Sequence, residues 1–231
     1  MTIDIITLFP DMLREPLQAS ILGRAQQNGY VTVNLVNLRD FARDKHRSVD
    51  APPFGGGAGM VLRADVLFAA VESVRRPETR VVLLTPQGTP FRQHHAQRLA
   101  EDEHIVLICG HYEGVDERVR QVLADSEYSI GDFVLTNGNI AALAVSDATV
   151  RLLPGVLGSE NSAADDSFGA DGAIEFPHYT KPAVFRNMAV PDVLRSGDHG
   201  RIEAWRQEQS RLRTVARRPD LMTTILHGEE T

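Results

Sequence analysis

The 231-residue chain contains a single cysteine and no apolar run approaching the roughly 20 residues that a membrane-spanning helix needs. One cysteine, Cys109, excludes an internal disulfide framework and a zinc site built from cysteines. The N-terminus has neither the basic region nor the cleavage site of a secretory signal. We therefore expect a cytoplasmic protein without a membrane segment.

An excess of positive charge is also missing. The 24 Lys and Arg residues are outnumbered by 31 Asp and Glu residues, which gives a net charge of −7. This balance excludes a globally basic nucleic-acid binder, although it leaves room for a local basic patch. A hydrophobic content of 42% and a charged content of 24% are typical of globular proteins.

Short apolar runs alternate with helix-like stretches in the first part of the chain. The pattern predicts strands at residues 3–9, 31–36, 80–84 and 104–109. It predicts helices at residues 63–74, 92–100 and after Glu113. This alternation is typical of an α/β domain with a parallel sheet.

The character of the sequence changes after residue 158. Residues 159–176 hold five acids and no base, which indicates a flexible linker. Residues 177–220 hold nine Lys and Arg against five Asp and Glu, so this part is basic, and we expect a separate, mainly helical unit over 177–231. Asp198 is a candidate N-cap and Pro219 a candidate helix stop. Four apolar residues share one face of that helix: Ile202, Trp205, Leu212 and Ala216.

Two segments carry possible ligand chemistry. Residues 54–60 contain four glycines, which allow a close backbone approach to a ligand but also suit a flexible turn. They match neither a Walker A loop nor the GxGxxG pattern, so a dinucleotide-dependent oxidoreductase is disfavoured. In residues 108–118, a glycine and a cluster of polar side chains follow the end of a predicted buried strand. Ligands of α/β proteins bind at this end of the strands. Cys109 and His111 together allow a thiol nucleophile, but we favour the interpretation of Cys109 as a small buried hydrophobic residue, the usual role of a free cysteine.

Eleven blocks together resemble the bacterial TrmD-type tRNA (guanine-N1)-methyltransferases. They occur in the family's order over nearly the whole chain: LFPDM, RDFARDKHRSVD, FGGGAGM, LTPQG, CGHYEGVDERV, SIGDFVL, RLLPGVLG, DDSF, FPHYTKP, VPDVLRSGDH and WRQEQSRLRT. Each block alone is weak, but eleven in order are highly specific.

The resemblance implies a fold and a reaction. The fold is a SPOUT-type α/β domain, here residues 1–158, with a deep trefoil knot over about residues 80–158, followed by a small helical domain. The reaction moves a methyl group from S-adenosylmethionine to N1 of the tRNA guanosine at position 37, immediately 3′ of the anticodon. The active form is a homodimer with its active site at the subunit interface.

The resemblance also assigns site residues. Asp166, in the acidic linker, aligns with the general base and Arg151 with an arginine near it. An Asp in such a loop is more commonly an N-cap or a solvated acid. No protein metal site is expected, and Mg²⁺ at Glu113 or nearby carboxylates is left open. The expected donor-binding residues are Leu84, Thr85, Pro86, Gly88, Gly110, Tyr112, Glu113, Ile130, Gly131, Asp132, Phe133, Val134, Leu135, Asn137, Gly138 and Ala141. The expected tRNA-binding residues are Arg43, Lys45, His46, Arg47, His199, Arg206, Arg211 and Arg213.

Some positions depart from the family's usual pattern. Asn137 replaces a glycine, Asn139 a glutamate and Ala141 a proline, which we expect to loosen the donor pocket. His111 replaces an arginine and Ala58 a proline. Two rival hypotheses follow: another SPOUT-type RNA methyltransferase, and an RNA-binding protein that has lost catalysis.

Overall fold

The computed structural model describes residues 1–158, 166–169 and 172–222. They divide into two units, one covering residues 1–158 (unit 1) and the other the described residues from 166 onward (unit 2). Unit 1 contains the elements β1 Thr2–Thr7, α1 Asp11–Gln18, α2 Ser20–Gln27, β2 Thr32–Asn37, the 3-10 helix η1 Leu38–Phe41, β3 Asp50–Ala51, β4 Val61–Leu62, α3 Ala64–Val74, β5 Thr79–Pro90, α4 Gln93–Ala100, β6 His104–Cys109, α5 Glu117–Leu123, β7 Ser126–Ser129 and α6 Asn139–Val150.

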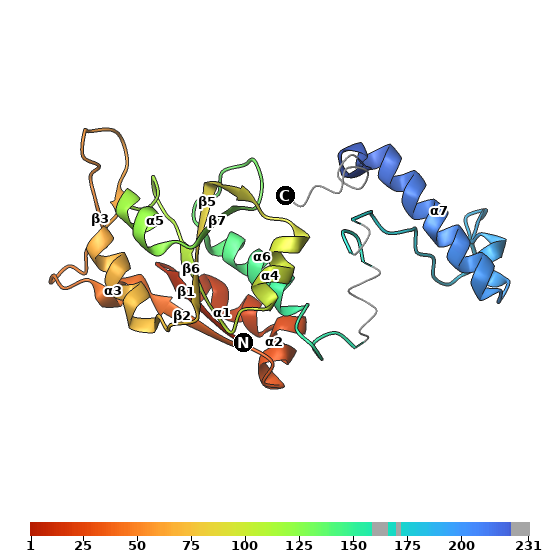
Figure 1. The fold of residues 1–231 in the computed structure, drawn as a ribbon, viewed down its shortest axis with the longest axis horizontal. Coiled ribbons are helices and arrows are strands. Elements are labelled where there is room, and N and C mark those ends of the chain that lie inside the picture. Colours follow the sequence, from red (N-terminus) through yellow and green to blue (C-terminus); the bar gives the residue numbers. More distant parts are fainter. Residues whose placement is uncertain (159–165, 170–171, 223–231) are drawn as a thin grey trace. The chain divides into compact units, whose positions relative to one another are not determined.

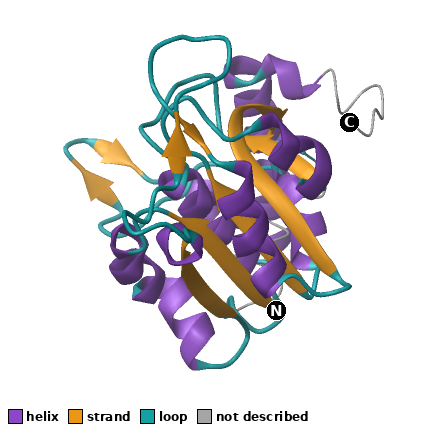
Figure 2. Cartoon of the chain, turned by 90° about the vertical axis from the view of Figure 1, so that its left-hand side faces the viewer, coloured by secondary structure: helices purple, strands orange, loops and turns teal. Residues whose placement is uncertain are grey.

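Unit 1 is a parallel sheet with helices on both faces. The five strands lie in the order β2-β1-β6-β5-β7, and every pairing is parallel. Figure 1 shows α3 and α5 on one side of the sheet and α1, α2, α4 and α6 on the other. Figure 2 views the unit from the side of α3 and α5. The predicted α/β class with a parallel sheet is confirmed.

Both faces of the sheet are buried, and the central strands show why. In β6 every residue is buried; Ile105 and Leu107 pack into one hydrophobic core, whereas Val106 and Ile108 pack into a second core on the opposite face. Successive side chains of a strand point to opposite faces, so a strand covered on both sides needs a continuous apolar run. The run at residues 104–109 meets this requirement.

Two details of the predicted strands are corrected. The strand expected at residues 80–84 runs from Thr79 to Pro90, with a shift of register between Leu84 and Thr89. Its second half pairs with β7, a short strand that was not predicted because only Tyr128 in it is a large apolar residue. Strand pairing, rather than local hydrophobicity, therefore extends β5.

Unit 2 is built around one long helix. Its elements are β8 Val184–Phe185, β9 Met188–Ala189, the 3-10 helix η3 Asp192–Arg195 and α7 His199–Arg217. Asp198 accepts a hydrogen bond from the backbone N of Arg201, as predicted for an N-cap, and α7 ends at Arg217, just before Pro219. The β8–β9 pair was not expected in a mainly helical unit.

The apolar stripe predicted on α7 is covered only in part among the described residues. Leu212 is 45% exposed and Ala216 is also exposed, whereas the buried position is Thr214. Ser210 and Thr214 lie on the side of α7 that faces Ile174. The Ser210 hydroxyl donates to the carbonyl of Ile174, and Thr214 Oγ1 accepts from the backbone N of Ile174. Of the predicted linker, residues 159–165 and 170–171 lie outside the described residues. Within the described part of the chain, no helix is long and apolar enough to cross a membrane.

Candidate functional site: a pocket at the carboxyl ends of the strands

The middle of β5, where its register shifts, and the segments that follow β6 and β7 line a pocket of about 300 Å³. This is the edge at which open α/β sheets bind ligands, and the volume lies at the lower end of the range for ligand pockets. The lining residues are Leu83, Leu84, Thr85, Pro86, Gln87, Gly110, His111, Tyr112, Glu113, Gly114, Val115, Tyr128, Ser129, Ile130, Gly131, Phe133, Val134, Leu135, Thr136, Asn137, Gly138 and Ala141.

The pocket wall depends on glycine where two segments meet. The backbone N of Gly138, just before α6, donates to the carbonyl of Gly110 at 2.9 Å. A Cβ at position 138 would lie 2.8 Å from Cα of Cys109, closer than real Cβ contacts come. Only glycine therefore lets the start of α6 approach the end of β6 so closely.

Most of the expected donor-binding residues line this one pocket. Gly88 and Asp132 are the exceptions among them. Gly88 instead packs against β7, where an added Cβ would lie 2.6 Å from the backbone N of Tyr128. Gln87, His111 and Thr136 lie within the expected donor loops (residues 84–88, 110–113 and 130–138) and also line the pocket. The lining residues outside those loops are Leu83, Gly114, Val115, Tyr128 and Ser129. Gly114, Val115 and Ser129 belong to the quoted motifs, but only the fold shows that they reach the pocket.

Cys109 is a buried structural residue. Its side chain is 4% exposed, and burial raises the pKa of the thiol far above its ordinary value. A thiol with a raised pKa is protonated at neutral pH and is a poor nucleophile. The preferred interpretation of Cys109 as a small buried hydrophobe is confirmed.

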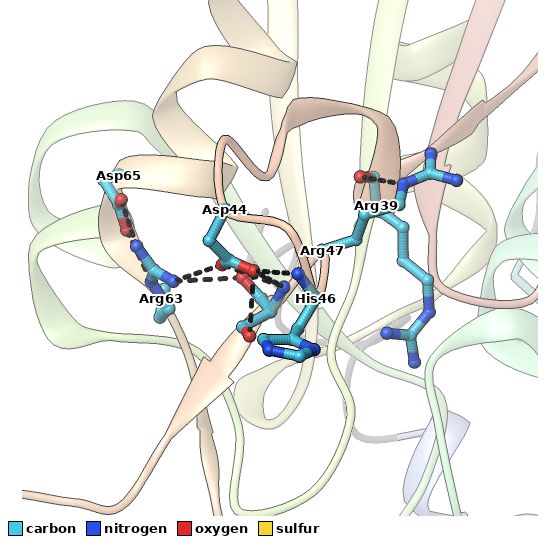
Figure 3. Close-up of polar contacts among 7 residues, drawn as sticks. Arg39, Asp44, His46, Arg47, Arg63 and Asp65 are labelled. Carbon is cyan, nitrogen blue, oxygen red and sulfur yellow. Dashed lines mark hydrogen bonds and ion pairs between the residues drawn. The ribbon is translucent and has the colours of Figure 1, made fainter.

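A basic loop, defined as residues 43–47, lies elsewhere in unit 1, after η1. Arg43, Lys45, His46 and Arg47 are all exposed. Arg47 has a positive φ of 52° and its Nε donates to the carbonyl of Arg39 at 3.1 Å. Figure 3 shows this contact and, on the other side of the loop, the carboxylate of Asp44. The four side chains are thus displayed at the surface, where phosphates can reach them.

The expected tRNA-binding residues of α7 differ in their surroundings. His199 is exposed in the first turn, and Arg211 pairs with Glu208 at 2.8 Å on the exposed face. The guanidinium carbon of Arg206, in contrast, lies 4.7 Å from the centre of the Phe176 ring. Arg206 therefore packs within unit 2, as a cation over an aromatic face does.

Comparison with known proteins identifies the family of the chain. The family model described as tRNA (Guanine-1)-methyltransferase TrmD matches residues 1–224. A tRNA (guanine-N(1)-)-methyltransferase of Staphylococcus haemolyticus is 56% identical over 96% of this chain and 91% of that protein. Those of Carboxydothermus hydrogenoformans and Brevibacillus brevis are 50% and 52% identical, over 96% and 100% of this chain and 87% and 95% of those proteins.

The chain belongs to the TrmD family. The predicted enzyme class, an S-adenosylmethionine-dependent tRNA (guanine-N1)-methyltransferase, is thereby confirmed. The α/β sheet agrees with this family.

The departures from the usual TrmD pattern are accommodated in the fold. Asn139 is 1% exposed; its Oδ1 accepts from Thr7 Oγ1 at 2.6 Å and its Nδ2 donates to the carbonyl of Phe9 at 3.0 Å. The Oδ1 of Asn137 accepts from the backbone N of Asn139, the first residue of α6, at 2.9 Å. Both amides therefore fix the loop that precedes α6, and Asn137 and Ala141 still line the pocket.

The two residues that align with TrmD catalytic positions fall in different units. Arg151 follows α6 in unit 1, and its backbone N donates to the carbonyl of Asp147 at 3.2 Å. Asp166 lies in unit 2, in a turn in which the backbone N of Gly169 donates to its carbonyl at 3.0 Å. Their roles in the reaction stay predictions.

Proposed function

We propose that this protein transfers the methyl group of S-adenosylmethionine to N1 of guanosine 37 of tRNA, with Asp166 as the general base. Membership of the TrmD family carries the reaction class. The pocket between the middle of β5 and the ends of β6 and β7 supports a small-molecule donor, because its glycine-containing loops expose backbone N–H and C=O groups to it.

The residues of the pocket fit an adenosyl sulfonium. Apolar side chains such as Leu84, Ile130 and Ala141 offer contacts to a purine ring, and backbone groups at Gly110 and Gly138 bound the same space. Glu113 supplies a carboxylate to the lining, which suits a cationic ligand. When bound, S-adenosylmethionine would supply a methyl group that needs only a positioned nucleophile.

The chemistry at guanine requires proton removal. Neutral N1 of guanine carries a proton and is a poor nucleophile, so a base must take that proton as the new bond forms. A carboxylate at Asp166 suits this role. A guanidinium at Arg151 would stabilise the negative charge that develops on O6.

The basic side chains form the proposed tRNA surface. An acidic protein needs local cations to bind the phosphate backbone. Arg43, Lys45, His46 and Arg47 of the basic loop are exposed, as are His199 and Arg211 of α7. We assign phosphate contacts to these side chains and to Arg213, while Arg206 supports unit 2 through Phe176.

A homodimer is part of the proposal. Large apolar side chains stay uncovered in unit 1 beside the pocket: Phe9 is 39%, Tyr112 44% and Ile140 50% exposed. Phe9 and Tyr112 are connected through the ring of His111, at centroid distances of 5.3 and 4.2 Å. A second copy of the chain would cover them. Light scattering should give twice the monomer mass, and Ile140→Asp should shift the protein toward monomer.

The decisive assay uses methyl-labelled S-adenosylmethionine and unmodified tRNA with guanosine 3′ of the anticodon, followed by nucleoside identification. Labelled 1-methylguanosine at that position supports the proposal. Label on another base or on ribose would favour a different RNA methyltransferase, and no label with donor bound would favour the non-catalytic alternative. Parallel reactions with Mg²⁺ and with a chelator test the ion that the sequence left open.

Asp166→Asn tests the base. The amide has nearly the same size but cannot accept the N1 proton, so we expect turnover to fall by about 10²- to 10⁴-fold, the usual contribution of general-base catalysis. Donor affinity, measured by calorimetry, should stay within about twofold because the pocket lies in the other unit. Wild-type turnover would remove Asp166 from the mechanism.

A further inference from the structure

Asp44 is the single acid within the basic loop, and its exposed carboxylate bonds back to the chain that follows it. Its Oδ1 accepts from the backbone N of His46 at 2.8 Å, and both oxygens lie 3.1 Å from the backbone N of Ser48. The hydroxyl of Ser48 also donates to Oδ1 at 3.2 Å. Such bonds from a side chain to the backbone two and four residues later close a tight turn.

Arg63 holds this turn from outside the loop. Its Nη1 lies 3.5 Å from Oδ2 of Asp44 and donates to the carbonyl of Ser48 at 3.1 Å. The other edge of the guanidinium is fixed by Asp65, whose two oxygens accept at 3.0 and 2.6 Å. Figure 3 shows Arg63 between the two carboxylates.

The backbone of Arg63 is attached to the hydrophobic core of unit 1. Arg63 directly follows β4 and precedes α3, and its backbone N donates to the carbonyl of Val49 at 2.9 Å. Val49 and Leu62 beside it are both fully buried in the core. A side chain anchored in the core therefore holds a surface loop.

The charges make this support necessary. Arg43, Lys45 and Arg47 place three positive charges within five residues, and like charges this close repel one another. Hydrogen bonds from the Ser48 backbone, followed by those from His46, lower the pKa of Asp44, so its carboxylate is ionised at neutral pH. The bond to Asp65 raises the pKa of Arg63.

We propose that Asp44, held by Arg63, is a positioning residue that presets the basic loop for tRNA. The proposal rests on the tRNA surface assigned above. Asp44 touches no substrate; it acts through the loop cations, because a loop that is already ordered loses less conformational entropy on binding. Its negative charge is turned toward Arg63, which keeps it away from incoming phosphates.

The test is steady-state kinetics of the full-length protein with unmodified tRNA. We expect Asp44→Ala to raise the KM for tRNA about tenfold, as the loss of order at one or two residues would. The kcat at saturating tRNA and the donor Kd should stay within about twofold of the parent protein, since neither depends on loop order. Arg63→Gln should raise the tRNA KM in the same way but less.

A matched control and a conservative variant separate positioning from general stability. Asp65→Asn removes the charge and one of the two acceptor oxygens from the other partner of Arg63 without touching the loop, and the tRNA KM should change less than about twofold. Asp44→Asn keeps an oxygen for the His46 and Ser48 backbone and should recover most of the affinity. In the Asp44→Asn background, Arg63→Gln should raise the tRNA KM less than it does alone, because the ion pair is already gone and only the bond to the Ser48 carbonyl is left to lose.

Two outcomes overturn the proposal. An unchanged tRNA KM in Asp44→Ala, with Lys45→Ala raising that KM, would leave the tRNA surface standing and remove the positioning role alone. An unchanged KM in Lys45→Ala and Arg43→Ala would remove the loop from the tRNA surface. Any effect of Asp44→Ala would then arise elsewhere, and the positioning role would be wrong as well.

Discussion

The interactions that stabilise unit 1 differ from those that stabilise unit 2. In unit 1, two hydrophobic cores pack on opposite faces of the sheet, with fully buried residues such as Ile5, Leu67 and Leu107. Among the described residues of unit 2, Thr214 alone is buried. Polar bonds and cation–aromatic contacts, such as Arg206 over Phe176 and Arg218 over Phe168, hold unit 2 instead.

This difference suits the proposed division of labour. A pocket that must hold a small donor in one geometry gains from a close-packed scaffold, because packed interiors deform little. A surface that binds a large polyanion needs charge more than a core. Unit 2 should therefore open locally at a lower free energy than unit 1.

Leu107→Ala should give the largest effect. Leu107 is 1% exposed at the centre of β6, and truncation of such a leucine costs about 2–5 kcal/mol. Leu212→Ala on α7 is the matched control; Leu212 is 45% exposed, so we expect a change within about 0.5 kcal/mol. Urea unfolding followed by circular dichroism measures both. Equal costs would contradict the contrast between the units.

His95 gives unit 1 a dependence on pH. The ring is buried beside Tyr128, at a centroid distance of 4.8 Å, and burial, together with repulsion from His94, lowers its pKa from 6.5 to about 4. The unfolded chain thus binds a proton before the folded one does, so this stability is complete above pH 6.5 and declines toward pH 4. The loss should be on the order of 2–3 kcal/mol.

The experiment on His95 compares free energies of unfolding at pH 7 and pH 5. His95→Gln is the informative variant, because glutamine at this position can still accept the bond from the backbone N of Arg92, 2.9 Å away in the parent protein. The variant should lose much of the stability difference between the two pH values. An unchanged difference would assign the acid sensitivity to other groups.

The smallest expected effects come from substitutions of one buried threonine in each unit, Thr214 in unit 2 and Thr149 in unit 1. Thr214 Oγ1 accepts from the backbone N of Ile174 at 3.1 Å and donates to the carbonyl of Ser210 at 2.8 Å. Thr214→Val should therefore destabilise unit 2 by about 1 kcal/mol, since it leaves the partly buried N–H of Ile174 without its partner. Thr149→Val in α6 should be neutral or stabilising, because the Thr149 Oγ1 is buried without a hydrogen-bond partner among the described residues.

Hydrogen exchange measures this last comparison. The amide of Ile174 should exchange faster in Thr214→Val, while the amides of β6 keep their protection. Faster exchange in both places would mean that the units unfold together, and the distinction drawn between them would fail.

Much of the architecture follows from local sequence patterns. The apolar run at residues 104–109 predicts a strand buried on both faces, and Asp198 and Pro219 mark the limits of α7. The ordered motifs predict the family, which the comparisons confirm. The stripe on α7 leaves Leu212 and Ala216 exposed, because helical spacing alone does not say which face of a helix packs against another segment.

The sequence by itself determined where apolar runs, glycines and caps occur, and these decide the class of fold and most of the pocket loops. Only the tertiary structure decided which distant residues meet: Asn139 with Thr7, Gly138 with Cys109, and Arg63 with Asp44. The physical reason is that local patterns report burial and backbone preference. Contacts across the sheet depend on the order of its strands, β2-β1-β6-β5-β7, which no local pattern encodes.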